Sequence, residues 1–570
     1  MTSSHAPCKS KTNNTEDSKT EVPREENSYS GEADYLYSTK LAKKLSLAEA
    51  CETLVASPLF PLALNSSGRM YYKCSSRINS RQLKFTHSIC GLGMTVKGHQ
   101  EYLTNNPGAY NSILFLKALD LHLSQKKLFT DRPDSLGVSA RIFMRPIAVK
   151  LEGHEEHEIF RPSFRIYNDG TITATLSPLL GFSELAADKV VNIVTNKAKN
   201  NIESVLCEKD TYLALNETQA ALLPFKQRYA QRRTICESIE IGLAKTATLE
   251  ILEEKFETHE LLQAETFTLS DLAHWLLALI ERSITNGHVR NKIQWTAAQH
   301  ISNTLSKTWF GKPIVYIQDH TNQLASANDN WVAHNHLIQC IMARTYLKDP
   351  YKLPEVTITD LRAFDDYNSF YSEAVSLVFS STQVSEFISN AESYTFSNLT
   401  SDILILNETA HHLLVHYGYL CTDIDKCLTT TKISQADIKN IEFETSFISI
   451  QKYGETSKYF EKILLSDSLG IFKNLAQKKI DTRRKYLELE EKIAADSQTR
   501  RMTLVFGIVA SASLSPELMQ PLLKVLGFQI ETKEINKLVG ILLSGCAVLF
   551  IALTINFSAK LFKSIFFKNR

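Results

Sequence analysis

Three side chains that commonly bind metal ions recur at one-turn spacing in the segment NETAHHLLVHYG. Glu408, His412 and His416 stand at i, i+4 and i+8, so they share one face if the segment is helical. A carboxylate and two imidazoles at this spacing can bind a divalent transition-metal ion. The alternative is a partly buried polar stripe whose side chains hydrogen-bond within the protein. A divalent metal ion is therefore the one cofactor that the sequence indicates, without identifying it.

Other chemistry-bearing patterns are weaker. His154 and His157 in GHEEHE lie between two predicted strands, where a solvated hairpin loop accounts for them. The glycines that follow Cys90 fit neither the dinucleotide-binding nor the P-loop spacing. The sequence also contains no GxSxG, HExxH or protein-kinase motif. These patterns predict that the chain is not an enzyme.

Two apolar segments near the C-terminus have the length expected of membrane helices. Leu538 to Phe557 is a run of twenty residues without a charge, which as a helix matches the roughly 30 Å hydrocarbon core of a bilayer. Met502 to Phe528 is also largely apolar. Each run contains a pair of small residues four positions apart, which lets membrane helices pack closely. The pairs are Gly507 with Ser511 and Gly540 with Ser544.

The first of these runs is interrupted by Ser515-Pro516-Glu517, which has the residue types of a helix start. A carboxylate inside a bilayer is costly and usually faces a pore or a partner. The candidates to line a polar path are Ser511, Ser513, Ser515 and Glu517. Alternatively, the span ends near Leu514, and Glu517 caps an interfacial helix in water.

Basic residues gather on the two outer flanks of this predicted hairpin. Six lie between Arg483 and Arg501, and the tail KLFKSIFFKNR follows the second run. Because cytoplasmic flanks carry the excess of Lys and Arg, both termini are expected in the cytoplasm. The chain is then integral to the cytoplasmic (inner) membrane, with the lipid bilayer as a partner. The alternative is a buried hairpin of a soluble protein.

Hydrophobic periodicity organises the rest of the chain. Ala33 to Asn65 has helical spacing, whereas Pro162 to Leu176 has the alternation of a hairpin around an Asn-Asp-Gly turn. The fold class is therefore predicted to be an α+β cytoplasmic region followed by long helices and a C-terminal two-helix transmembrane hairpin. The predicted divisions are a disordered polar tail (1–34), a mixed α/β domain with an antiparallel sheet (35–220), a helix-rich domain (221–432), long connector helices (433–501) and the membrane hairpin with its basic tail (502–570).

The connector has a weak seven-residue rhythm. Its apolar positions are Phe472, Leu475, Tyr486, Leu489 and Ile493, while Lys479 and Thr482 interrupt the pattern. No glycine or proline separates Ile471 from Arg501, so one helix can run unbroken through this segment. A coiled coil and a solvated connector helix are both consistent with this pattern.

The composition narrows the class of partner. The chain has 570 residues, a formal net charge of +1 and 44% hydrophobic residues. Near-neutral charge argues against nucleic acid, because phosphate binding needs a concentrated basic face. The ten cysteines are scattered without a CxxC pair, as is typical of reduced thiols.

The C-terminal architecture resembles the CorA-like superfamily of two-span metal-ion transporters. The shared features are a cytoplasmic α/β domain, helices from about residue 434, a long basic-flanked helix (TRRKYLELEEKIAADSQTRRMTLVFGIV), a second apolar run and a basic tail. The resemblance implies a pentamer whose first spans line a pore. The family's Gly-Met-Asn signature is absent, since the chain reads SLSPE at residues 513–517, so magnesium selectivity is not implied.

These patterns predict an oligomeric membrane protein with a large cytoplasmic sensing domain: a CorA-like ion channel, a transporter or a membrane effector that forms a homo-oligomer. The alternative is a cytoplasmic enzyme, or a binding or scaffold module, tethered to the inner membrane by an inert C-terminal anchor. A channel requires a polar face on the membrane helices, whereas the alternative requires a functional constellation within residues 35–430.

Overall fold

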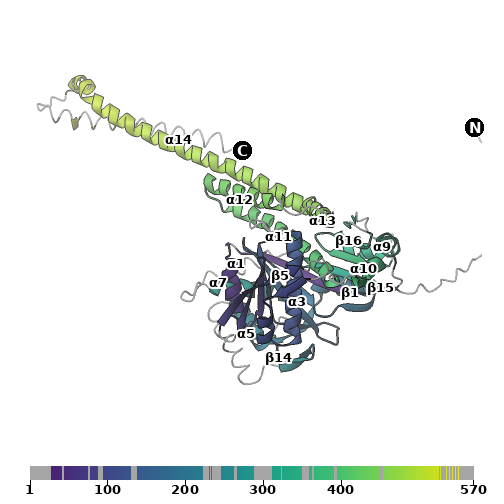
Figure 1. The fold of residues 1–570 in the computed structure, drawn as a ribbon. Helices are drawn as coiled ribbons and strands as arrows, with labels where there is room; N and C mark the ends of the chain where they lie inside the picture. Colours follow the sequence, from purple (N-terminus) through teal and green to yellow (C-terminus); the bar gives the residue numbers. More distant parts are fainter. Residues whose placement is uncertain are drawn as a thin grey trace, which may run out of the picture. The chain divides into compact units, whose positions relative to one another are not determined.

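The structure, a computed structural model, describes residues 27–221, 246–287 and 311–525 apart from short internal gaps, and isolated positions in between and up to residue 550. The chain divides into two compact units (Figure 1). The first, called here the sheet unit, comprises residues 1–420 and 440–474. The second, the helical unit, comprises residues 421–439 and 475–570.

Most strands of the sheet unit join one fifteen-stranded sheet in which β1 (Ser28–Lys40) is central. The main path is β13-β14-β12-β8-β9-β10-β1-β15-β17-β16, and β2, β3, β4, β7 and β11 branch from it. β1 is antiparallel to both β10 and β15, while β15 and β17 are parallel. The other strands are β2 (Leu62–Asn65), β3 (Arg69–Cys74), β4 (Arg77–Gln82), β7 (Ser139–Phe143), β8 (Ile147–Leu151), β9 (Glu158–Tyr167), β10 (Thr171–Pro178), β11 (Phe182–Ala186), β12 (Ile202–Glu208), β13 (Thr246–Ile251), β14 (Glu254–Glu260), β15 (Lys312–His320), β16 (Tyr367–Tyr371) and β17 (Ser376–Ser380), with β5 (Lys84–His87) and β6 (Met94–Lys97) forming a separate pair.

The central strand differs from the sequence expectation. Helical spacing was expected from Ala33, but β1 runs to Lys40 and the first helix begins only at Leu47. Tyr35 and Tyr37 alternate with Leu36 and Ser38, and all four side chains are buried. Because both faces of a central strand are covered, tertiary packing outweighs local propensity here. Residues 1–26 of the expected polar tail lie outside the described residues.

The helices pack around this sheet and continue into the helical unit (Figure 1). The described helices are α1 (Leu47–Val55), α2 (Gln100–Asn105), α3 (Ala109–Leu128), α4 (Ala187–Lys189), α5 (Lys209–Ala221), α7 (Leu269–Gly287), α9 (Ala327–Ala343), α10 (Thr382–Asn390), α11 (Phe396–Asp425), α12 (Thr430–Ile448), α13 (Gly454–Leu464) and α14 (Asp467–Val525), with a π-helical turn at Val190–Thr195 and a 3-10 turn at Lys197–Lys199.

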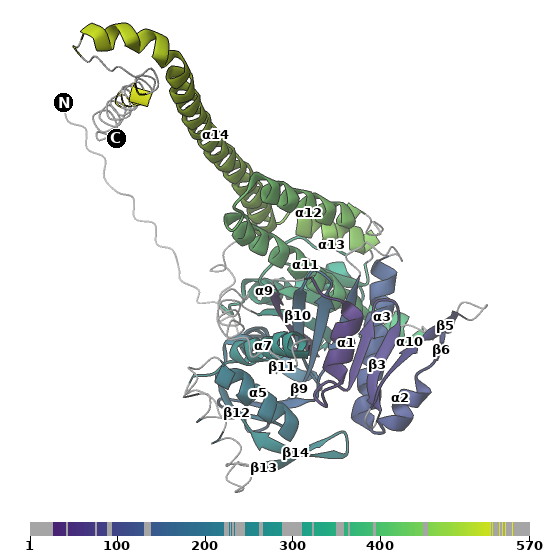
Figure 2. The ribbon, with the colours of Figure 1, turned by 90° about the vertical axis from the view of Figure 1, so that its left-hand side faces the viewer.

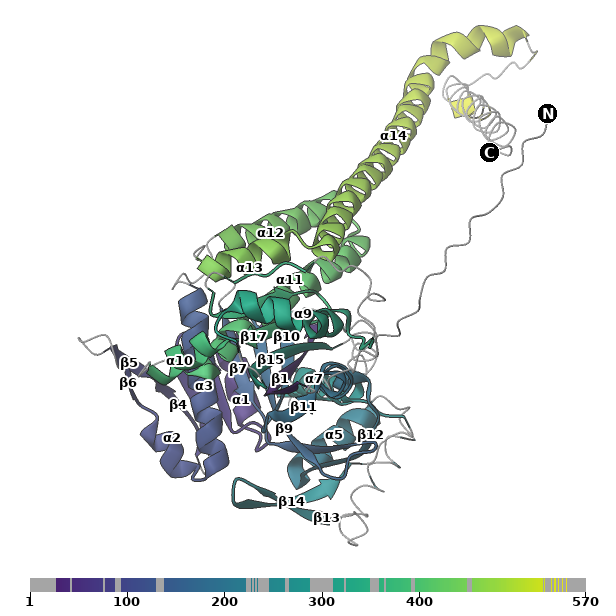
Figure 3. The same cartoon turned by 90° about the vertical axis from the view of Figure 1, so that its right-hand side faces the viewer.

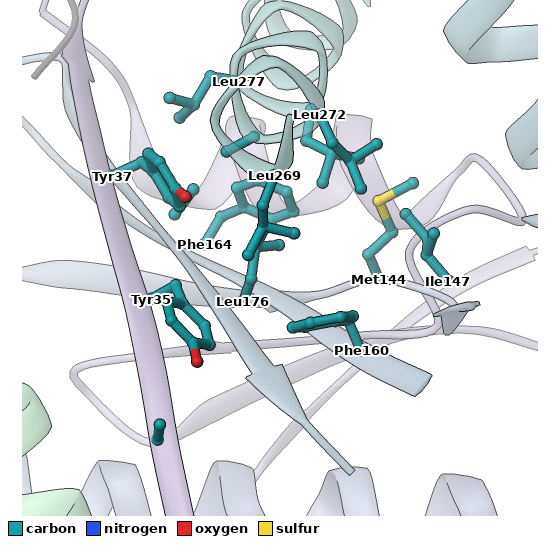
Figure 4. Close-up of a cluster of buried hydrophobic side chains, with 14 of the residues drawn as sticks. Tyr35, Tyr37, Met144, Ile147, Phe160, Phe164, Leu176, Leu269, Leu272 and Leu277 are labelled. Carbon is teal, nitrogen blue, oxygen red and sulfur yellow. The ribbon is translucent and has the colours of Figure 1, made fainter. Parts of the chain in front are cut away.

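One face of the sheet packs on α1 and α7 and forms the main hydrophobic core (Figure 2). Figure 4 shows Tyr35, Phe164 and Leu176 of the sheet beside Leu269 and Leu272 of α7. Burial of each such side chain stabilises the fold by about 1.5–3 kcal/mol relative to leaving it in water. This core fixes the strands that carry the candidate site on their other face.

That other face is polar and is also buried. In β10, Ile172, Ala174 and Leu176 belong to the core, whereas Thr173 and Thr175 alternate with them and are fully buried as well. The cover is α11, whose Glu408 accepts a hydrogen bond from the Thr175 hydroxyl. α3 lies beside α11, with Lys127 Nζ 2.6 Å from Asp402 Oδ2 (Figure 3).

Several local predictions can be compared with the observed elements. The predicted Pro162–Leu176 hairpin is confirmed by the antiparallel β9–β10 pair. Pro146 separates β7 from β8, and residues 402–406 belong to α11. Strands β13 to β17 lie within the range 221–432, where a helix-rich domain was expected.

The predicted membrane hairpin is contradicted. Among the residues that the structure describes, none forms a helix with both the length and the apolar character needed to cross a bilayer. α14 owes its length largely to charged sequence between Asp467 and Arg501, and most of Leu538–Phe557 lies outside the described residues. This finding overturns the two-helix transmembrane element of the fold class, the classification as a transmembrane protein, and the integral localisation in the inner membrane.

Candidate functional site

The polar stripe expected around Glu408 lies on α11 and faces the sheet. Glu408, His411 and His412 are at most 3% exposed, and Asn407 is also fully buried. Residues three and four apart share one face of a helix, so the stripe meets one row of strand residues. Charged and imidazole groups rarely occupy such positions unless they are paired.

Glu408 is held by a fork of two hydrogen bonds. Its two carboxylate oxygens lie 2.6 and 2.5 Å from the Nη1 and Nη2 atoms of Arg141 on β7. Arg165 of β9 lies 3.5 Å away, and the hydroxyl of Thr175 donates at 3.1 Å. Bidentate geometry is among the strongest arrangements for an ion pair. Removal of the carboxylate would leave two buried guanidinium groups without their counter-charge.

Arg165 is fully buried and has an unusual environment. Its Nε donates to Ser139 Oγ at 3.0 Å, and its guanidinium carbon lies 4.8 Å from the Tyr167 ring centroid and 5.6 Å from that of Phe129. Aromatic faces stabilise a desolvated cation. The Nη2 atom has no hydrogen-bond partner. The site therefore contains one more guanidinium than Glu408 can neutralise, and the rings compensate in part.

A second ionic group lies one helical turn further along. His412 Nε2 is 3.1 Å from Asp169 Oδ2, and Lys40 Nζ is 2.9 Å from the same oxygen. Burial alone would raise the pKa of Asp169, but His412, Lys40 and the Thr171 amide hold it well below its ordinary value. Burial lowers the pKa of His412. The pair therefore buries an imidazole against a carboxylate that Lys40 also contacts.

Lys312 at the start of β15 is the least satisfied cation of this face. It is fully buried, and its Nζ lies 3.7 Å from the Tyr371 ring centroid without a hydrogen-bond partner. Burial holds the pKa of Lys312 well below its ordinary value, with Glu373 opposing that shift. Nearby, His411 Nδ1 is 3.3 Å from Ser38 Oγ, and burial lowers the pKa of His411 to about 3.

The three predicted metal ligands share a face, but each contacts a different partner. Glu408 pairs with arginines, His412 with Asp169, and His416 Nε2 lies 3.4 Å from Asn440 Oδ1 with its ring stacked on Phe443. Within the described part of the chain, no group of three or more His, Cys, Asp or Glu side chains is arranged to hold a metal ion. This arrangement matches the alternative of a hydrogen-bonded polar stripe.

The helical unit has a different character. One face of α14 packs on the end of α11 and the start of α12 through buried Ala476, Ile480 and Leu487. Polar contacts border this face. They are Lys479 with Asp425, Arg483 with the Cys427 carbonyl, Arg484 with Asp437, and Thr430 with Glu491.

Another face of α14 carries an exposed apolar stripe. The stripe consists of Leu475, Tyr486, Leu489 and Ile493, whose exposed fractions are 42%, 49%, 57% and 59%. From Glu488 to Gly507 every side chain is exposed. A helix without packing partners is only marginally stable in water, so this stretch lacks its usual source of stability within the described chain.

The other sequence-predicted site residues lie further along the same helix or beyond it. Ser511, Ser513, Ser515 and Glu517 belong to α14, which runs on to Val525 without the predicted break, and their side chains lie outside the described residues. Gly507 lies on an open part of α14. Gly540 and Ser544, the expected packing pair of the second run, lie outside the described residues.

Sequence reasoning missed the strand partners of α11. Arg141 and Arg165 occupy matching positions of β7 and β9, directly opposite each other in the ladder. Charged residues that alternate with core residues are usually interpreted as solvent-facing. In both segments an arginine stands among β-branched and aromatic residues. This pattern could have indicated buried arginines, but it also occurs in strands with one solvent-facing side.

Comparison with known proteins adds no functional assignment. No protein-family model matches the chain, and no curated protein or solved structure is detectably similar to it. The CorA-like resemblance therefore stays a prediction from the sequence. Any function has to be argued from the contacts of the chain itself.

Proposed function

We propose that this protein is a binding module that self-associates through α14 and acts as a scaffold. The observation that carries the proposal is the apolar stripe of Leu475, Tyr486, Leu489 and Ile493, exposed on a different face of α14 from its packed face. Burial of four such side chains from each of two helices would contribute about 1.5–3 kcal/mol per side chain before the costs of association. The occupant that we assign to this stripe is a second copy of the chain.

Periodicity supports a helical occupant. Thr482, Tyr486, Leu489 and Ile493 are separated by four, three and four residues, the spacing of one seam of a two-stranded coiled coil. The three apolar members, Tyr486, Leu489 and Ile493, are exposed to a similar extent. A partner helix in the same seam would supply the tertiary packing that Glu488–Gly507 lacks.

Charge supports a second copy in antiparallel orientation. Residues 478–485 carry five basic and one acidic side chain, whereas residues 486–496 carry four acidic and one basic. In an antiparallel pair the basic half of each helix lies against the acidic half of its partner, and in a parallel pair like charges meet. The proposal thus keeps the predicted homo-oligomer but favours a pair over the pentamer implied by the CorA-like resemblance.

The polar face beneath α11 supports a scaffold more than an enzyme. Its charged groups are covered by the helix and pair mainly with one another. Catalysis needs side chains that can reach a substrate. The stripe on α14 is, in contrast, an exposed apolar surface that a partner could bury.

The proposal is tested by sedimentation equilibrium of the full chain and of a Leu489→Glu/Ile493→Glu variant. The wild type is expected to sediment as a dimer and the variant as a monomer, because two charges in the seam would be desolvated without partners. Ala494→Glu is the control, since it adds a charge one position later, about 100° round the helix from Ile493 and outside the stripe. A monomeric wild type, or equal dissociation by the control, would overturn the proposal.

A further inference from the structure

The end of β15 and one face of α9 bring together buried hydrogen-bond acceptors that have no donors. His320 is 5% exposed, His334 is 3% exposed and Asn330 is fully buried. The Nε2 atoms of both histidines and the Oδ1 atom of Asn330 lack any hydrogen-bond partner. An unsatisfied buried polar atom costs about 1–3 kcal/mol, so three of them in one place require an explanation.

The contacts of these side chains determine which atoms are left over. The Asn330 amide nitrogen donates to the Ser380 carbonyl at 2.9 Å, which identifies Oδ1 as the unused atom. His320 Nδ1 lies 3.4 Å from the Thr321 carbonyl oxygen, and a proton on Nδ1 that is donated to this oxygen leaves Nε2 unprotonated. His334 Nδ1 lies 3.0 Å from the Tyr29 hydroxyl, which can accept its proton and leave Nε2 bare.

The groups are close together. The ring centroids of His320 and His334 are 4.5 Å apart, and Asn330 stands one turn before His334 on α9. A bond from zinc to an imidazole nitrogen is about 2 Å long, so one ion can lie between two rings at this separation.

We propose that His320, His334 and Asn330 bind one divalent transition-metal ion such as Zn²⁺. Two neutral imidazoles and an amide oxygen are ligands that such an ion accepts, and water can complete the coordination. The contacts of the two Nδ1 atoms, to a backbone carbonyl and to a hydroxyl, are those that orient histidine ligands in metal sites. The ring of Phe379, 5.1 Å from both imidazoles, makes the surroundings apolar.

This proposal is independent of the α14 interface, because all of its residues belong to the sheet unit. It also differs from the metal site predicted on α11, whose carboxylate is committed to Arg141. The bound ion would fix the end of β15 to α9.

The test measures metal content and Co²⁺ absorption of the full-length protein after equilibration with Zn²⁺ or Co²⁺ and removal of excess ion. The wild type is expected to retain about one ion per chain, with visible Co²⁺ bands of a four-coordinate site. His320→Asn and His334→Asn keep a polar group near the Nδ1 position but lose Nε2, so both are expected to lose the ion. His336→Asn on the same helix is the matched control and is expected to retain it.

A fourth variant separates ligation from folding. Tyr29→Phe leaves all three ligands in place and removes the hydroxyl at His334 Nδ1, so the affinity for Co²⁺ is expected to fall about 10–100-fold. Circular dichroism and elution volume verify that each variant is folded. A wild type that retains neither ion, or folded His→Asn variants that retain as much as the wild type, would overturn the site in favour of bound water.

Discussion

Two helices of this protein distribute polar and apolar side chains in opposite ways. α11 buries Glu408, His411 and His412 against a sheet, whereas α14 exposes Leu489 and Ile493. Both arrangements cost free energy when the side chains are considered alone. The polar groups of α11 find partners within the chain, but the described chain offers none to the apolar stripe of α14. The polar face of α11 is thus satisfied within one chain, whereas the apolar stripe of α14 can be buried only by a second molecule under the present proposal.

The comparison also separates two kinds of specificity. The ion pairs under α11 fix one register between helix and sheet, because each carboxylate oxygen has a particular guanidinium nitrogen opposite it. The seam of α14 is less directional, so charge along its two halves has to select the orientation of the partner. A change in either region should therefore have a characteristic effect, on folding in the first and on association in the second.

The largest effect is expected from Glu408→Ala. Loss of the carboxylate leaves Arg141 and Arg165 buried without a counter-charge and is expected to lower the free energy of unfolding by about 3–5 kcal/mol. Urea denaturation followed by circular dichroism measures this. Lys127→Ala breaks an exposed ion pair between α3 and Asp402 of α11 and should cost about 1 kcal/mol or less. Equal costs for the two variants would show that the buried cluster is not essential to the fold.

Acid is expected to weaken the α11 region next. Burial lowers the pKa of His411 and of His416 to about 3, while a histidine in the unfolded chain titrates near pH 6.5. The unfolded state therefore binds more protons between these values, and stability falls as pH drops through that window, by up to about 1.4 kcal/mol per pH unit for each group.

The measurement is the free energy of unfolding at pH 7 and at pH 5.5, with His411→Asn as a variant in which the dependence should be shallower. The seam of α14 contains no histidine between Leu475 and Ile493, so self-association should change little over the same range. A stability that is flat with pH, or an association that fails before the fold does, would reverse the assignment of the two regions.

Charge variants test the orientation of the seam. Lys478→Glu/Lys485→Glu leaves residues 478–485 without net charge, and Glu488→Lys/Glu490→Lys gives residues 486–496 a net charge of +1, so each protein alone should dimerise about tenfold more weakly. An equimolar mixture should associate more tightly than either variant alone, because the acidic half of one chain then meets the basic half of the other. The recovery is measured by sedimentation velocity at low salt, and no weakening in either variant would contradict the antiparallel pair.

The smallest effect, with the opposite sign, is expected at Lys312. Its buried ammonium has no hydrogen-bond partner, so Lys312→Met removes a desolvation penalty while keeping most of the packing volume. The free energy of unfolding should stay unchanged or rise by about 1 kcal/mol. A loss of 2 kcal/mol or more in urea denaturation would mean that Lys312 stabilises the polar face through its charge.

The sequence predicts parts of this molecule that depend on neighbouring residues. The β9–β10 hairpin follows from alternation and an Asn-Asp-Gly turn, and Glu408, His412 and His416 share a face because helical periodicity is local. The partners of that face could not be derived, since Arg141 and Arg165 are more than 240 residues away from Glu408 in the chain. β1 was mistaken for part of a helix for the same reason, because its burial on both sides comes from distant segments.

The membrane prediction failed for a different reason. It depended on the length and charge-free character of two apolar runs, which is a statement about composition. In the described chain, α14 continues through Ser515-Pro516-Glu517 without a break, and none of the described helices satisfies the requirements of a span. The exposed stripe lies on the same helix, in its charged connector portion. The seven-residue rhythm of the sequence predicted a coiled-coil seam there only weakly.

Hydrogen–deuterium exchange of the full chain at two protein concentrations tests the central claim most directly. If a second copy covers the stripe, amides of Glu488–Gly507 are protected at high concentration and exchange faster on dilution, while those of the α11 stripe keep the same protection at both. Fast exchange of Glu488–Gly507 at every concentration would contradict the account, because the helix would then have no partner in solution.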